Sequence, residues 1–229
     1  MASKSRKAFD DNIQDVENLV HYYEFADESF RDTKIKPPPG ADIVLRSAVV
    51  MLVTYWEAYV EDIVTEGVAH LVKHASDPQK LPKELRKAIA KELKADKNDI
   101  AIWQLAGDGW RSLLTKRLPD LTKGRNRSFN TPKSGQTREF VRSALGIDNI
   151  TSSWKVDSKE SAESCQTLDK LVELRGKIAH RGKLSKPLRV DDITTLTEWI
   201  KQLVSKTGGN INTCLKKSCG VPLWSKPKK

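Results

Sequence analysis

Residues 41–63 constrain the fold of this chain more than any other segment, because their apolar residues recur every three or four positions. This period places apolar side chains on one stripe of an α-helix. Directly before the segment, the sequence PPPG ends any preceding helix, because proline lacks an amide donor and fixes its backbone. The segment predicts a long amphipathic helix that starts near Ala41 and Asp42. Its stripe comprises Leu45, Ala48, Val49, Leu52, Trp56, Tyr59, Val60 and Ile63.

Most of the remaining chain also has a helical pattern. Helices are predicted over residues 5–30, residues 83–95, parts of 100–118, a short stretch ending at Gly146, a stretch from about Ser158, and a last one from Asp191 through Leu203. The stretch from about Ser158 begins directly after Asp157, which has capping-box-like spacing with Glu160. Strand patterns and solenoid repeats are not evident. The expected fold is an all-α bundle, with an N-terminal helix and Pro-rich turn in 1–40, a main domain in 41–207 and a basic tail in 208–229.

The charge balance favours polyanionic partners. The chain has 229 residues, with 40 Lys and Arg against 30 Asp and Glu, for a net charge of +10. Such a surplus favours RNA first, although it also aids solubility. The apolar run 48–53 is far shorter than the roughly 20 residues that span a membrane, so no membrane contact is expected. The first residues are polar where a secretion signal would be apolar, and the three cysteines form no CxxC pair. We expect a cytoplasmic protein without a structural metal.

The segment LVELRGKIAHRGK, residues 171–183, places Arg175 five residues before His180 near a helix end. Histidine titrates near neutrality and arginine matches phosphate oxygens, so the pair suits phosphate chemistry. The spacing alone is weak, and a cationic helix end that complements the helix dipole is the alternative. Five positions turn an ideal helix by roughly 140°, so either the helix ends near Ala179 or Arg175 reaches around it.

Three stretches, in one order, resemble the RiboL-PSP-type branch of the HEPN superfamily. The first is SAVVMLVTYWEAYVEDIV, residues 47–64, which is similar to a long helix with central aromatic and acidic residues. The second is FNTPKSGQTREFVRSALGIDNITSSW, residues 129–154, and the third is the R-x4-6-H signature with its AHRG ending. The resemblance implies an all-α HEPN-like domain over 41–207.

The resemblance also implies a function. Many HEPN domains are metal-independent endoribonucleases without a cofactor, in which Arg175 would stabilise the transition state and His180 would act as acid or base. It further implies a homodimer with both motifs in one cleft, a role as a toxin or in antiviral defence, and a separately encoded antitoxin or regulator. Active relatives commonly carry Asn, Asp or another polar residue where this chain has Gly176. The alternative is therefore a non-catalytic HEPN module that binds RNA or a partner protein.

Basic residues in two places are candidates for binding the RNA backbone, since phosphate charge dominates such affinity. A predicted basic loop over 121–140 supplies one set, for which a solvated, mobile loop is the alternative. The other set flanks the Arg/His pair. The candidates are Lys123, Arg125, Arg127 and Lys133 in the loop, and Lys177, Arg181 and Lys183 beside the pair.

Two further sets of residues on the predicted long helix can each be interpreted in two ways. Glu57 and Glu61 lie four residues apart and either position Arg175 across the bundle or face water. Glu66, His70 and His74 have the spacing of metal ligands, but the HExxH order is absent and a solvated helix face is favoured. The aromatic residues Tyr55, Trp56 and Tyr59 are expected in the core.

Overall fold

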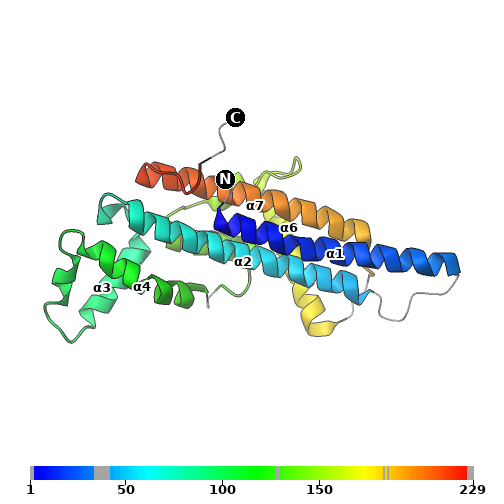
Figure 1. Cartoon of the computed structure of the whole chain (residues 1–229), viewed down its shortest axis with the longest axis horizontal. Coiled ribbons are helices and arrows are strands. Elements are labelled where there is room, and N and C mark those ends of the chain that lie inside the picture. Colours follow the sequence, from blue (N-terminus) through cyan, green and yellow to red (C-terminus); the bar gives the residue numbers. More distant parts are fainter. Residues whose placement is uncertain (1–2, 34–41, 127–128, 183, 185, 226–229) are drawn as a thin grey trace.

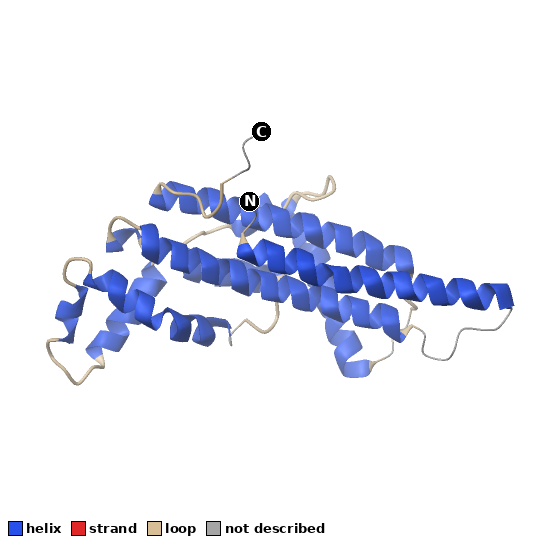
Figure 2. Ribbon diagram, viewed as in Figure 1, coloured by secondary structure: helices blue, strands red, loops and turns tan. Residues whose placement is uncertain are grey.

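The computed structural model describes residues 3–33, 42–126, 129–182, 184 and 186–225, and within these residues it contains seven α-helices and no strand, as Figure 2 shows. The all-α prediction is therefore confirmed. Three short 3-10 helices join the longer elements. The α-helices are α1 (Lys4–Thr33), α2 (Ile43–His74), α3 (Lys83–Lys94), α4 (Gly109–Asn126), α5 (Ser134–Leu145), α6 (Ser161–Arg181) and α7 (Val190–Cys219), and the 3-10 helices are η1 (Pro78–Lys80), η2 (Ala101–Leu105) and η3 (Ile150–Ser153).

Helix α2 is the centre of the molecule. It packs against α1, α7, α6, α4 and α5, and α1, α2 and α7 run side by side along the long axis (Figure 1). Its predicted stripe is buried and continues through Val64, Val68 and Leu71. By length and composition alone α2 could also cross a membrane, with a mean hydropathy of 1.4 over its most apolar window. Core helices meet the same criterion, and the burial of the stripe shows that α2 is one here.

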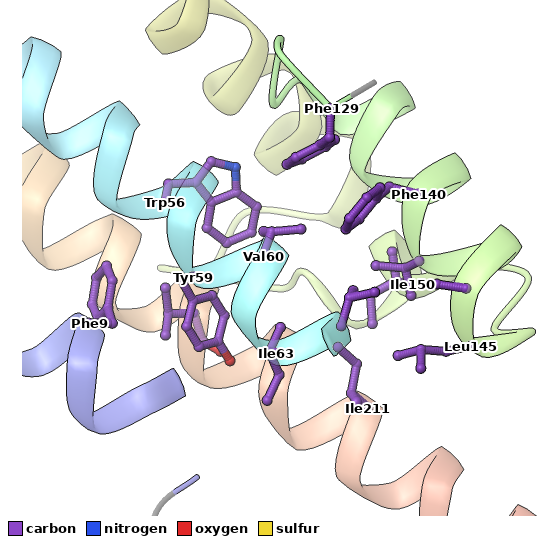
Figure 3. Close-up of a cluster of buried hydrophobic side chains, with 14 of the residues drawn as sticks. Phe9, Trp56, Tyr59, Val60, Ile63, Phe129, Phe140, Leu145, Ile150 and Ile211 are labelled. Atoms are coloured by element: carbon purple, nitrogen blue, oxygen red, sulfur yellow. The ribbon is translucent and has the colours of Figure 1, made fainter. Parts of the chain in front are cut away.

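Aromatic side chains fill the core where α2 meets its neighbours (Figure 3). Trp56 makes an edge-to-face contact with Trp154 at 5.8 Å, and Phe9 of α1 makes another with Tyr59 at 5.7 Å between ring centroids. Trp56 Nε1 donates to the carbonyl oxygen of Pro132 at 3.1 Å. Trp56 and Tyr59 are thus core residues, as the helical spacing predicted.

Helix α1 completes the bundle. Its side chains Phe9, Ile13 and Val16 are buried. Glu66 of α2 accepts hydrogen bonds from the backbone nitrogens of Lys4 and Ser5, so its carboxylate satisfies donors that the first turn of a helix leaves unpaired.

Helix α4 is longer than the sequence indicated. The predicted basic loop begins at residue 121, but α4 continues to Asn126 with Pro119 inside it, so that part of the loop prediction is wrong. Proline removes one helical hydrogen bond, and tertiary contacts outweigh this cost. Leu113 and Leu114 are buried, and the guanidinium of Arg111 donates to the carbonyl oxygens of Lys73 and Ala75 at 2.9 and 2.8 Å.

Two helix boundaries also differ from the prediction. Asp157 and Ser158 have φ values of 49° and 63°, which a helix does not accept, so α6 begins at Ser161 with a capping box between Glu160 and Glu163. Helix α7 continues through residues 208–219, which the sequence pattern assigns to the basic tail, because Ile211 and Leu215 are buried. The predicted stop of α5 at Gly146 is confirmed, with φ of 68° at its C-cap.

Candidate functional site

Arg175 and His180 both lie on α6, which continues unbroken to Arg181 and ends at Gly182 with φ of 68°. The helix therefore does not end near Ala179, and the two side chains leave it roughly 140° apart. Arg175 lies on the side that carries the buried residues Leu168, Leu171 and Val172, whereas His180 is exposed. The two side chains therefore start from different sides of one continuous helix.

The guanidinium of Arg175 lies against the central helix. Its Nε atom is buried and has no hydrogen-bond partner among the residues that the structure describes. Glu57 of α2 is close enough for electrostatic coupling: burial raises the pKa of Glu57, and the positive charge of Arg175 lowers it in part. Of the two interpretations of Glu57, the structure therefore supports proximity to Arg175 across the α2–α6 contact.

Glu61 lies one helical turn after Glu57 and shares its surroundings. Burial raises the pKa of Glu61 to about 7, and the negative charges of Glu57 and Asp62 add to this rise. Two carboxylates so placed repel each other, which favours a proton on one of them at neutral pH. The α2 side of the site thus holds one carboxylate coupled to Arg175 and one that titrates near neutrality.

His180 belongs to an exposed, charged face of α6. Glu173 and Lys177 lie seven and three residues before it and therefore share its side of the helix. Lys133 at the start of α5 forms an ion pair with Glu173 at 2.7 Å. This bond raises the pKa of Lys133 and lowers that of Glu173. Of the predicted loop cations, Lys133 is thus tied to α6, and part of its charge is neutralised there.

Asp169 is a positioning residue that sequence reasoning missed. Its carboxylate accepts hydrogen bonds from Ser134 N at 2.7 Å and from Ser134 Oγ at 3.0 Å. Together with the ion pair between Lys133 and Glu173, it holds the first turn of α5 against the middle of α6. No local pattern indicates this contact, because the partners are 35 residues apart in the sequence.

Gly176 lies half-buried in the interior of α6. A methyl group at this position would meet no heavy atom within 4 Å, so the fold does not require glycine there for space. The helix does not require it for its backbone either, since glycine destabilises helix interiors. The departure from a polar residue next to Arg175 therefore has no steric cause in this chain.

The other predicted RNA-binding residues lie on α4 and α6 or outside the described residues. Lys177 is exposed on α6 and Lys123 is exposed on α4. Arg125 and Arg181 lie in the last turns of α4 and α6, but their side chains lie outside the described part of the structure. Arg127 and Lys183 are also outside the described residues.

The row of Glu66, His70 and His74 does not form a metal centre. Glu66 binds the first turn of α1, and His70 Nε2 lies 2.9 Å from the carbonyl oxygen of Val221. The two histidine rings pack on each other with centroids 4.5 Å apart. Among the described residues, no group of three His, Cys, Asp or Glu side chains is suited to hold a metal ion.

The described residues form seven α-helices with the apolar helix α2 at their centre and Arg175 and His180 on the penultimate one, an arrangement of the HEPN type. The family model described as RiboL-PSP-HEPN matches residues 9–212. The chain therefore belongs to the RiboL-PSP-HEPN family, and HEPN domains are known for ribonuclease and other RNA-related roles. No curated protein and no solved structure matches the chain significantly.

Proposed function

We propose that this protein is a metal-independent endoribonuclease in which two copies of the chain join their Arg175 and His180 side chains in one cleft. The observation that carries the proposal is the R-x4-H motif on α6 of a RiboL-PSP-HEPN chain, with Arg175 held beside Glu57 and His180 exposed. Because the pair diverges on its helix, two copies related by a twofold axis are the simplest way to bring a second histidine to a phosphate bound near Arg175.

The chemistry uses the substrate's own 2′-hydroxyl. His180 of one copy removes the proton of that hydroxyl as its oxygen attacks the adjacent phosphorus. The bond from phosphorus to the 5′-oxygen breaks, and His180 of the other copy delivers a proton to that oxygen. Arg175 stabilises the additional negative charge of the pentacoordinate phosphorane. The products are a 2′,3′-cyclic phosphate and a free 5′-hydroxyl, and neither step needs a metal or a cofactor.

Cleavage of a mixed, end-labelled RNA pool in EDTA tests the proposal. The wild-type protein is expected to leave 2′,3′-cyclic phosphate ends, and His180→Ala is expected to cleave about 10²–10⁴-fold more slowly. Arg175→Lys, which keeps the charge but loses the planar fork, should cost about 10²–10³-fold. The matched control is His21→Ala, which removes an exposed histidine from α1. Equal cleavage by wild type and His180→Ala would show that His180 is not the acid or base.

A non-catalytic module is the second candidate, and Gly176 is the observation that favours it. If wild type and His180→Ala both bind RNA without cleaving it, this candidate replaces the first. Since the space beside Gly176 is open, Gly176→Asn should then restore the polar residue of active relatives without disturbing the fold. Cleavage that appears in Gly176→Asn and disappears in the double variant with His180→Ala would identify a weakened nuclease.

We propose that the nuclease acts as a toxin or an antiviral effector in the cytoplasm. A separately encoded antitoxin or regulator would control its activity. Induced expression in bacteria tests this role directly. Growth arrest by wild type that His180→Ala relieves is the expected result. Equal tolerance of both forms at equal soluble levels would contradict a toxin role.

A further inference from the structure

A shallow apolar pocket lies between α3, η2 and α4, a part of the molecule that the proposed nuclease site does not use. Its volume is about 200 Å³. Figure 1 shows α3 and α4 together at one end of the long axis, displaced from α6. The pocket is lined by Pro78, Leu81, Leu85, Arg86, Ile89, Ala90, Leu105, Trp110 and Leu114.

Exposed apolar side chains extend the pocket outward. Ile100, directly before η2, and Ile102 and Trp103 within it are 67%, 53% and 74% exposed. Residues three apart lie on one side of a 3-10 helix, so Ile102 lies beside the pocket-lining Leu105. Ile100 and Trp103 are also three apart and lie on a neighbouring side of η2, so exposed apolar surface continues from the edge of the pocket around this helix, and such a surface marks a binding site.

The rim of the pocket on α3 is basic. At about 100° per residue, Arg86, Lys83 and Lys94 all lie within about 40° of Ala90, which is exposed at the pocket. The acidic residues of this helix, Glu84 and Glu92, lie more than 100° away, toward its other side. The rim thus presents positive charge directly beside apolar surface.

We propose that this pocket, lined by Leu85, Arg86 and Ala90 and extended at its edge by Ile102, binds an acidic amphipathic helix of a partner protein. An amphipathic helix inserts apolar side chains from positions i, i+3 or i+4, and i+7 into such a groove. Glu or Asp residues flanking those positions pair with Arg86, Lys83 and Lys94. A second copy of the same face is a poorer occupant, because it would bring two basic rims together.

A selection with the intact protein tests the proposal. An unbiased library of 16-residue peptides is selected for binding to wild type, and the enriched peptides are synthesised and measured by fluorescence anisotropy. We expect enriched peptides to be acidic, with apolar residues at helical spacing. Ala90→Trp, which fills the pocket from an exposed position, and Arg86→Glu should each weaken their binding at least tenfold.

The matched control is Lys206→Glu, which makes the same kind of charge change on the exposed side of α7 and should leave binding unchanged. Circular dichroism is used to check that each variant is folded. Absence of enrichment, enrichment of basic peptides, or equal binding to Ala90→Trp would overturn the proposal. A wild-type dimer that Ala90→Trp converts to a monomer would also overturn it, since the patch would then be an interface between copies. Because RNA cleavage is measured separately, failure here does not affect the proposed nuclease.

Discussion

Glu57 on α2 is electrostatically coupled to Arg175 on α6, and this coupling joins the central helix of the bundle to the motif that defines the family. Burial raises the pKa of Glu57, and only the charge of Arg175 counteracts this rise. Among the described residues, no cation lowers the pKa of Glu61, one turn further on, where burial and the charges of Glu57 and Asp62 raise it to about 7. The α2 side of the site therefore responds to pH near neutrality.

Glu61 should make the protein more stable in weak acid than in weak base. Its pKa is raised from 4.5 in a free side chain to about 7 in the fold, so the folded state binds its proton more tightly. This contribution is fully present below about pH 4.5 and is lost as the pH rises through 7. We expect Glu61→Gln to flatten the dependence of Tm on pH between 5 and 8. Glu139→Gln, at an exposed position where Arg142 lowers the pKa, should not flatten it.

Two glycines should respond in opposite ways to alanine. Gly176→Ala should stabilise the protein by about 1 kcal/mol, because α6 gains helix propensity and the methyl group meets no atom within 4 Å. Gly208→Ala should destabilise it by about 1–3 kcal/mol, because its Cβ would lie 2.5 Å from Tyr59 Oη, which donates to the carbonyl oxygen of Val204. Urea unfolding measures both changes, and a loss of stability in Gly176→Ala would contradict the open space beside it.

Thr207 should be a critical polar residue of the core. Trp154 Nε1 donates to Thr207 Oγ1 at 2.9 Å in a fully buried place. Thr207→Val keeps the shape but leaves this donor unpaired, which should cost about 1–3 kcal/mol. Thr213→Val on the same helix is the control, because Thr213 and Thr207 each donate a hydrogen bond to the carbonyl oxygen four residues earlier, but Thr213 is exposed. Equal unfolding free energies for the two variants would show that the Trp154 bond contributes little.

Helix α1 should be needed for folding rather than act as a cover over the site. Phe9→Ala removes a buried ring that contacts Tyr59, and should lower the unfolding free energy by about 3–5 kcal/mol. Tyr22→Ala, at a position 67% exposed on the same helix, should change it little. A chain without residues 1–40 should be insoluble. A soluble and more active truncated chain would instead make α1 a cover.

Lys177 should contribute to RNA affinity through charge alone. It is exposed three residues before His180, on the same face of α6. Lys177→Glu should weaken binding of single-stranded RNA and reduce the slope of log K against log salt by about 0.7 or more. Lys206→Glu, on the exposed side of α7, is the control. An unchanged slope for Lys177→Glu would remove this residue from the RNA interface.

Helices with a strong apolar period could be predicted from the sequence, whereas the contacts between the helices could not. The α2 stripe from Leu45 to Ile63 fixes one face over five turns, so its burial followed directly from the pattern. The extent of α4 did not follow, because Pro119 and several basic residues weaken its local signal while Arg111 anchors its start to the end of α2. Local helix propensity is a weak guide to the ends of a helix where such tertiary contacts determine them.

The same limit applies to the candidate site. Arg175 and His180 were evident from their motif, but their divergence required knowing that α6 continues to Arg181. The bond from Ser134 to Asp169 and the coupling of Arg175 to Glu57 join residues that are far apart in the sequence. Only the packing of α5 and α2 against α6 brings these residues together.

The unbroken course of α6 past His180 has a consequence for how such a protein would be controlled in a cell. On an unbroken helix, Arg175 and His180 of a lone copy start from sides roughly 140° apart. Under the proposed function, abundance then acts as a switch, because activity below the dissociation constant of the dimer grows with the square of the protein concentration. A cell could keep a small amount of such a nuclease harmless by dilution alone.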